Sequence, residues 1–192
     1  MTTTRLVRTS HIAALVAGVA WSLLGILSLV TPDPERYLDV LMLVTLAVTV
    51  PAVTGVYVVQ RAQIGQFGRI TFPLTLGGLV AMLAGMVAHL AGAEMMRDLL
   101  SIAGMAGWVI GLLLFGIATA RARVLPIWAG VALALSQPLT VLTGAALAPV
   151  SPLSNFGDYA GAIANGIIWL AVGAALRSRA TVSTRRSAVT AS

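Results

Sequence analysis

One uninterrupted apolar stretch constrains the fold of this chain more than any other feature of its sequence. Residues from Leu99 to Ala120 carry no charge, and Arg97 and Arg121 lie on either side of them. At a rise of ~1.5 Å per residue, a helix of this length extends ~33 Å, enough to cross a hydrocarbon core ~30 Å thick. We therefore predict a transmembrane helix here.

Five further segments have the same character, so the sequence predicts an all-α polytopic membrane bundle of six helices. The predicted spans are residues 12–31, 38–60, 71–93, 99–120, 126–148 and 159–178. Only 9% of the 192 residues are charged, whereas a soluble domain has about 25%. Residues 1–178 then form one transmembrane domain, and residues 179–192, rich in Ser, Thr and Arg, form a disordered cytoplasmic tail.

The distribution of arginine predicts the orientation. With a cytoplasmic N-terminus, the cytoplasmic segments contain Arg5, Arg8, Arg61, Arg69, Arg121, Arg123, Arg177, Arg179, Arg185 and Arg186. Only Arg36 and Arg97 then lie outside, together with all the acidic residues. The positive-inside rule therefore favours a multi-pass protein of the cytoplasmic (inner) cell membrane with both termini inside. The same rule explains the net charge of +6 without a nucleic-acid partner.

A layer of polar and tryptophan side chains is expected near the middle of the membrane. Counted along the spans, this candidate mid-membrane polar site comprises Trp21, Ser22, Thr49, Trp108, Ser136, Gln137, Asn165 and Trp169. One interpretation is hydrogen bonding between helices. The other is a small cavity, which the predicted helix breaks at Pro51 and Pro138 favour because proline removes a backbone donor and bends a helix.

The two halves of the chain resemble one another, which is compatible with an inverted repeat of three plus three helices. The interval from Trp21 to Pro51 equals that from Trp108 to Pro138. The segments ending at the two tryptophans, which begin at Ala17 and at Ala103, match apart from one inserted glycine. Such repeats are common in secondary transporters. Chance similarity between sequences rich in Ala, Gly, Leu and Val is the alternative.

His89 is the one titratable side chain expected well inside a span, near the outer surface. It continues the stripe formed by Gly77, Ala81 and Gly85, which directs it towards the bundle and towards Glu94, Asp98 or Asp158. An ionisable group in a membrane is a functional candidate by default, here a proton-sensitive one. A neutral, hydrogen-bonded packing role is the alternative.

Stripes of small residues predict close helix packing. They are Ala14-Gly18-Ser22, Gly77-Ala81-Gly85, Ala103-Gly107-Gly111 and Ala132-Ser136-Thr140-Gly144. Contacts within the chain are one interpretation, and a homodimer formed by an outward-facing stripe is the other.

Catalytic motifs are missing from the sequence. It has no cysteine, no His-Glu-x-x-His zinc motif, no Gly-x-Ser-x-Gly elbow, no phosphate-binding loop and no pair of carboxylates within the spans. We therefore expect no enzymatic activity, no metal site and no cofactor.

The junction between the fourth and fifth spans carries a resemblance. The segment from Leu114 to Arg121 is followed by Arg123-Val124-Leu125-Pro126-Ile127-Trp128. This resembles small six-helix bacterial integral membrane proteins of domain-of-unknown-function type, which show a basic residue shortly before Leu-Pro-x-Trp. The resemblance implies the six-helix topology and no functional residues.

Three functions are consistent with these features. The first is a non-catalytic membrane protein, structural, regulatory or a partner subunit, that lies in the lipid bilayer and associates with itself or with another membrane protein. The second is a small transporter, or a bundle that binds lipid or another hydrophobic molecule, with a polar site at mid-membrane. The third is a pH-responsive membrane sensor based on His89 and the outer acidic residues.

Overall fold

The computed structural model describes residues 3–30, 36–150 and 159–189, and in these ranges the chain is helical with no strand. The helices are α1 (Thr3–Val30), α2 (Arg36–Gln60), α3 (Gly65–Leu90), α4 (Glu94–Ala122), α5 (Ile127–Leu147) and α6 (Ala162–Val189). A 3₁₀ turn, η1 (Ala148–Val150), follows α5. The predicted turn at 32–35 and the connection from 151 to 158 lie outside the described residues.

Five of the six helices, α1 to α5, are long and apolar enough to cross a membrane, and the helical structure confirms the predicted all-α class. The apolar part of α6 is shorter, from Ala162 to Ser178. Tyr159 and Ala160 form a turn before α6, so this helix begins later than the predicted span at 159–178. Its last turns, up to Val189, overlap the segment for which the sequence predicts a tail.

Two connections are tighter than the sequence suggests. Gly65 adopts a φ of 69°, and this single left-handed residue reverses the chain, so that α3 starts within the predicted loop at 61–69. Gly92, with a φ of 76°, makes the next reversal. The predicted charged turn at 94–98 is instead the first turn of α4, where an ion pair from Glu94 to Arg97 at 2.6 Å stabilises the helix.

The prolines at Pro51 and Pro138 lie inside α2 and α5, and neither of them ends its helix. A third internal proline, Pro73, lies in the third turn of α3. Each proline lacks the N–H that would bond to the preceding turn, so the helical hydrogen bonding weakens locally while the helix continues.

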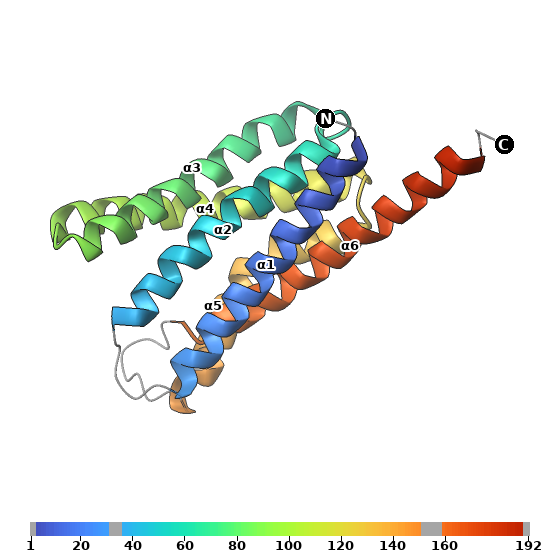
Figure 1. The fold of residues 1–192 in the computed structure, drawn as a ribbon. Coiled ribbons are helices and arrows are strands. Elements are labelled where there is room, and N and C mark those ends of the chain that lie inside the picture. Colours follow the sequence, from blue (N-terminus) through green and yellow to red (C-terminus); the bar gives the residue numbers. More distant parts are fainter. Residues whose placement is uncertain (1–2, 31–35, 151–158, 190–192) are drawn as a thin grey trace.

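The contacts between the helices divide them into two groups of three. The most extensive contacts join α3 to α4 and α1 to α6, followed by α1 to α2 and α4 to α5, whereas α2 with α3 and α5 with α6 share fewer contacts. Figure 1 shows α1 alongside α6, and α3 alongside α4. We refer to α6, α1 and α2 as the first unit, and to α3, α4 and α5 as the second unit.

Glycines bring the helices of the two closest pairs into backbone contact. A Cβ added at Gly18 of α1 would lie 2.7 Å from the backbone nitrogen of Leu170 in α6. One added at Gly104 of α4 would lie 2.6 Å from the backbone nitrogen of Met82 in α3. Packing of this kind replaces the hydrophobic effect as the force that holds helices together in lipid.

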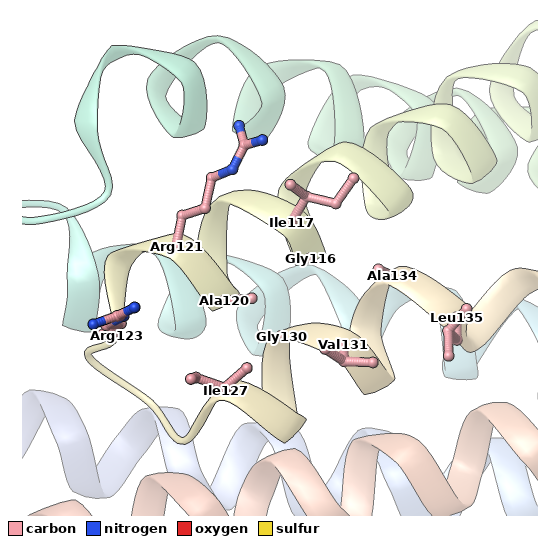
Figure 2. Close-up of a pocket in the computed structure, with 10 residues that line it drawn as sticks. All are labelled: Gly116, Ile117, Ala120, Arg121, Arg123, Ile127, Gly130, Val131, Ala134 and Leu135. Atoms are coloured by element: carbon pink, nitrogen blue, oxygen red, sulfur yellow. The ribbon is translucent and has the colours of Figure 1, made fainter.

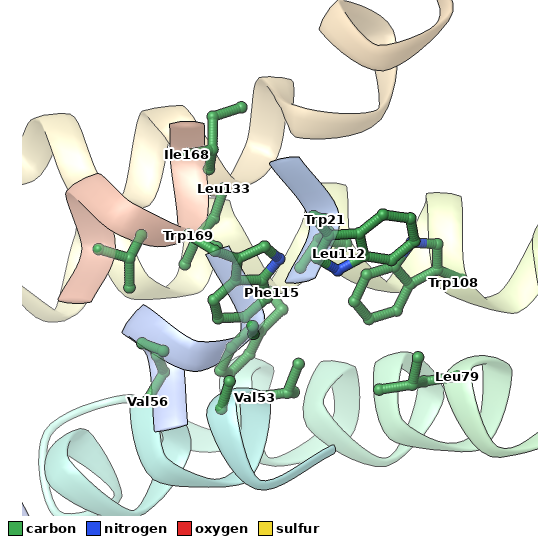
Figure 3. Close-up of a cluster of buried hydrophobic side chains, with 14 of the residues drawn as sticks. Trp21, Val53, Val56, Leu79, Trp108, Leu112, Phe115, Leu133, Ile168 and Trp169 are labelled. Carbon is green, nitrogen blue, oxygen red and sulfur yellow. The ribbon is translucent and has the colours of Figure 1, made fainter. Parts of the chain in front are cut away.

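All six helices contribute to one buried apolar cluster (Figure 3). Its large members include Trp21 from α1, Trp108 and Phe115 from α4, and Trp169 from α6, each at most 5% exposed. The tryptophans predicted at mid-membrane are therefore buried together in the interior, where Figure 3 shows them among aliphatic side chains from neighbouring helices.

Candidate functional site

Charged and polar side chains from different helices meet at His89, near the end of α3. Nε2 of His89 lies 3.4 Å from Oδ2 of Asp39 on α2, and Nδ1 lies 3.7 Å from Oε1 of Glu94 on α4. Nη1 of Arg97 lies 3.4 Å from the same Nδ1. The hydroxyl of Tyr159 donates to Oδ1 of Asp39 over 3.3 Å. His89 thus contacts α2 and α4, and Asp39 links the cluster to Tyr159 in the turn before α6.

Asp39, His89, Arg97 and Tyr159 of this cluster also line a cavity of about 280 Å³. We call it the His89 pocket. It is lined by Asp39, Met42, Leu46, Met82, Gly85, Met86, His89, Arg97, Ser101, Met105 and Tyr159. The lining residues come from both units, since α2 and Tyr159 flank one side and α3 and α4 flank the other. The pocket therefore lies where the two units meet.

Four methionines give the pocket its apolar part. Asp39 of α2 contacts His89 of α3, and the two helices are antiparallel. One helical turn further from these residues, Met42 and Met86 therefore lie at the same level. Methionine is flexible and polarisable and adapts to ligands of different shapes. The lining includes one carboxylate, Asp39, and one guanidinium, Arg97, whose charge is already paired with Glu94 and Asp98 outside the lining. The arrangement suits a small molecule with an apolar body and a polar or cationic group.

A second set of contacts joins the two units at the opposite end of α2, ~32 Å from Asp39 along the helix. Nε2 of Gln60 donates to Oγ1 of Thr119 on α4 over 2.8 Å, and both side chains are buried. One turn earlier, the ring of Tyr57 stacks on that of Phe72 of α3, with centroids 4.0 Å apart. These contacts close this end of the boundary between the units.

The predicted mid-membrane layer divides into two parts in the structure. The first is a hydrogen-bonded pair, in which Nε1 of Trp21 donates to Oγ1 of Thr49 over 2.9 Å and Thr49 in turn donates to the carbonyl of Thr45. Ser22, half-buried, lies against Gly166 of α6. Trp108 is buried with its backbone against Gly78.

The second part lies along α5 and α6 and is incompletely bonded. Ser136 donates to the carbonyl of Leu133 within α5. Nε2 of Gln137, Oδ1 of Asn165 and Nε1 of Trp169 are buried and have no hydrogen-bond partner among the described residues. Thr140 contacts Gly161, so the antiparallel helices place Gln137 and Asn165 at the same level. An unpaired donor and an unpaired acceptor thus lie on opposite sides of the boundary between the units.

No group of three or more His, Asp or Glu side chains that could hold a metal ion is found in the described part of the chain. His11, the other histidine, lies with Nδ1 3.0 Å from the carbonyl oxygen of Gly173 and so contributes to the packing of α1 on α6.

Sequence reasoning missed much of the His89 pocket. It proposed His89 and Glu94, but not Asp39, Tyr159 or the methionines. A signal was present, because Met82, Met86 and His89 follow helical spacing on one face of α3. The partner face on α2, with Asp39 and Met42, follows the same period, but only the fold shows that the two faces oppose each other.

Comparisons of this chain with protein families, curated proteins and solved structures found no match.

Proposed function

We propose that this protein is a non-catalytic integral membrane protein that acts as a small carrier. It is built from two inverted three-helix halves, α1 to α3 and α4 to α6, and it works by movement of the first unit against the second. The observation that carries the proposal is a set of helix contacts that occurs twice. These contacts relate α1 to α4, α2 to α5 and α3 to α6. The same correspondence matches α6, α1 and α2 of the first unit to α3, α4 and α5 of the second unit.

The repeated contacts agree atom by atom. A Cβ at Gly18 would meet the nitrogen of Leu170 at 2.7 Å and the carbonyl oxygen of Gly166 at 3.0 Å. A Cβ at Gly104 would meet the nitrogen of Met82 at 2.6 Å and the carbonyl oxygen of Gly78 at 2.9 Å. Two turns further along each helix, the pattern recurs. The equivalent glycines are Gly18 and Gly104, Gly25 and Gly111, Gly166 and Gly78, and Gly173 and Gly85.

This register also refines the match in sequence. It aligns Ala17-Gly18-Val19-Ala20 with Ala103-Gly104-Met105-Ala106. Because Gly25 and Gly111 keep the same alignment, the helices leave no room for an inserted glycine. Trp21 therefore corresponds to Gly107, and Trp108 corresponds to Ser22. Trp21 and Trp108 thus lie on different faces of the two equivalent helices. With the offset that relates Gly18 to Gly104, Pro51 of α2 corresponds to Gln137 of α5, one residue before Pro138.

Three helices per half give the halves opposite orientations in the membrane. Sites of secondary transporters with this plan lie at the interface between repeats, and the His89 pocket is lined by α2 and α3 from the first half and by α4 from the second half. With a cytoplasmic N-terminus, as the arginine distribution predicts, the pocket faces the outer surface. The contact between Gln60 and Thr119 faces the cytoplasm.

Two sets of contacts between the units are suited to alternate. The pair of His89 and Asp39 joins the units on one side, and the pair of Gln60 and Thr119 joins them on the other. Buried polar atoms without partners carry a cost in free energy. A displacement of α5 against α6 that brings Nε2 of Gln137 to Oδ1 of Asn165 removes this cost, which would favour a second state.

The absence of cysteine allows a direct test with introduced thiols. A Met86→Cys reporter in the His89 pocket is alkylated with a membrane-impermeant maleimide in oriented vesicles. The thiol of Met86→Cys first carries a removable protecting group, while Gln60→Cys is cross-linked to Thr119→Cys with a short bifunctional reagent. The cross-link holds the two units together at the end opposite to the His89 pocket, and the protecting group is then removed. We expect labelling from the outer side to rise several-fold. Labelling that is independent of the cross-link would overturn the proposal.

A partner subunit is the second candidate, and one observation favours it. A Cβ at Gly77 would have nothing within 4 Å, and Gly77 and Ala84 are both exposed on α3, two turns apart. Small residues on an outward face allow a second helix to approach closely. Cross-linking of Gly77→Cys in membranes tests this, since a dimer predicts a covalent pair and a monomer predicts none.

A further inference from the structure

We propose that the groove between the end of α4 and the start of α5 is a binding site for an anionic phospholipid. The groove has a volume of about 550 Å³ and lies entirely within the second unit (Figure 2). Its occupancy therefore does not depend on movement between the units.

The floor and one wall of the groove are apolar. Gly116 packs on Ala134, and Gly130 packs on Ala120, so the two helix backbones touch and leave a channel along their seam. Ile127, Val131 and Leu135 follow one another on successive turns of α5, with exposures of 55%, 44% and 45%. They extend over ~12 Å of the helix. This row of side chains runs in the direction in which an acyl chain lies in a bilayer.

Two arginines stand at one end of the groove. Figure 2 shows Arg121 and Arg123 at the same end, with Val131 and Leu135 further along. Both arginines are exposed, and no ion pair to a carboxylate forms at either of them in the described ranges. The guanidinium of Arg121 lies over the ring of Phe67 of α3 at 5.6 Å.

The backbone fixes the second arginine. Arg123 adopts a left-handed conformation with a φ of 52° in the short turn between the helices. Trp128, which is 49% exposed, is the second residue of α5, and exposed tryptophan is typical of the headgroup level of a membrane. The charged end therefore lies where phosphates lie, and the apolar row where acyl chains lie.

This combination selects one ligand. Guanidinium groups pair well with phosphate oxygens, and basic pockets between membrane helices bind anionic headgroups. A free phosphate would leave the apolar row without contacts. A zwitterionic lipid would bring its own cation next to the arginines. A lipid with a net negative phosphodiester satisfies both parts of the groove.

The test uses the full chain purified in a mild detergent, with lipid binding followed by native mass spectrometry. The probes are dioleoyl phosphatidylglycerol, dioleoyl phosphatidylcholine and inorganic phosphate. We expect one phosphatidylglycerol to bind in preference to phosphatidylcholine, and phosphate not to bind. Each arginine near a surface contributes about fivefold in affinity, so Arg121→Gln with Arg123→Gln is expected to weaken binding by about 25-fold.

A matched control separates the groove from the charge of the whole protein. Arg61 and Arg177 are exposed, lie outside the groove and are on the same membrane side in the predicted topology. Replacing both with glutamine removes the same charge, and affinity is expected to change less than threefold. Val131→Trp, which fills the apolar row, is expected to displace the lipid while leaving both arginines in place. Equal losses in the two double variants, or equal binding of the two lipids, would overturn the proposal.

Discussion

Two adjacent glycines on α3, Gly77 and Gly78, have very different surroundings, although the sequence alone does not distinguish them. A Cβ on Gly78 would collide with the backbone of Gly107 and Trp108, whereas one on Gly77 would have nothing within 4 Å. In the predicted stripe of Gly77, Ala81 and Gly85, Gly85 does pack on α4, whereas Gly78 makes the contact in place of Gly77. A period of four residues predicts that helices approach closely, but it does not fix which neighbouring position makes the contact.

Gly78→Ala is expected to destabilise the protein by about 1–3 kcal/mol, because two helix backbones must separate to admit a methyl group. Gly77→Ala is the matched control, one residue away in the same helix. It is expected to be neutral or to stabilise by up to about 1 kcal/mol, since alanine is the better helix former. Thermal unfolding in detergent measures both. Equal effects of the two substitutions would contradict the packing of α3 on α4.

The hydrogen bond from Trp21 to Thr49 is one part of the predicted polar layer that the structure brings together. Hydrogen bonds between membrane helices contribute about 0.6 kcal/mol on average. A double-mutant cycle of Trp21→Phe and Thr49→Val is expected to give a coupling free energy of this size. Trp108→Phe in place of Trp21→Phe serves as the control, and additive effects in the first cycle would show that the two side chains do not interact.

At the scale of the helices, the sequence predicts most of what the structure contains. Long uncharged runs define α1 to α5 because a membrane requires helices of that length. The ends of helices are less predictable. The charged residues from Glu94 to Asp98 suggest a turn, but they contain no proline and can pair with one another, so α4 begins at once. The His89 pocket could be predicted only in part, because its α2 face and its α3 face come together through long-range packing.

The boundary between α5 and α6 gives a prediction for these two elements. Asn165→Leu removes the unpaired Oδ1 and replaces the side chain with an apolar one of similar size. The protein is expected to become more stable by about 1 kcal/mol or more, because the free-energy cost of a buried unpaired acceptor is removed. The carrier proposal expects the same variant to exchange more slowly between states. Thermal unfolding tests the first expectation, and the labelling rate of Met86→Cys tests the second.

An Asn165→Leu variant that unfolds at a lower temperature would show that Asn165 has a partner in the native state. Trp169→Phe provides an independent comparison, since it removes the unpaired Nε1 of the same helix face. A gain in stability from both substitutions would indicate that the described state leaves this part of the boundary unsatisfied.

At the scale of the whole molecule, the cluster at His89 joins the two units at one end. His89 faces Asp39 on α2, Tyr159 before α6, and Glu94 and Arg97 on α4, with Asp98 bound to Arg97. The contact of His89 with Asp39 holds α3 against α2 at this end.

Labelling of Met86→Cys is therefore expected to become several-fold faster when His89→Ala removes this contact. An Ala91→Cys reporter in the exposed turn after α3 is the control for general accessibility. A labelling rate that His89→Ala leaves unchanged would remove His89 from this role.

The two-unit arrangement also predicts which distances within the molecule are constant. Contacts between glycine-bearing helices fix α1 against α6 and α3 against α4. The contacts between α2 and α3 consist at their ends of one polar pair and one ring stack. Rigid units with a weaker boundary are what a rocking movement requires.

Distances between pairs of spin labels in lipid nanodiscs test this account most directly. Labels at exposed positions on α1 and α6 are expected to give one narrow distance. Labels on α2 and α3 near Asp39 and His89 are expected to give two populations, and lengthening at that end should accompany shortening near Gln60 and Thr119. A single narrow distance for every pair would contradict the proposal that the two units move against each other.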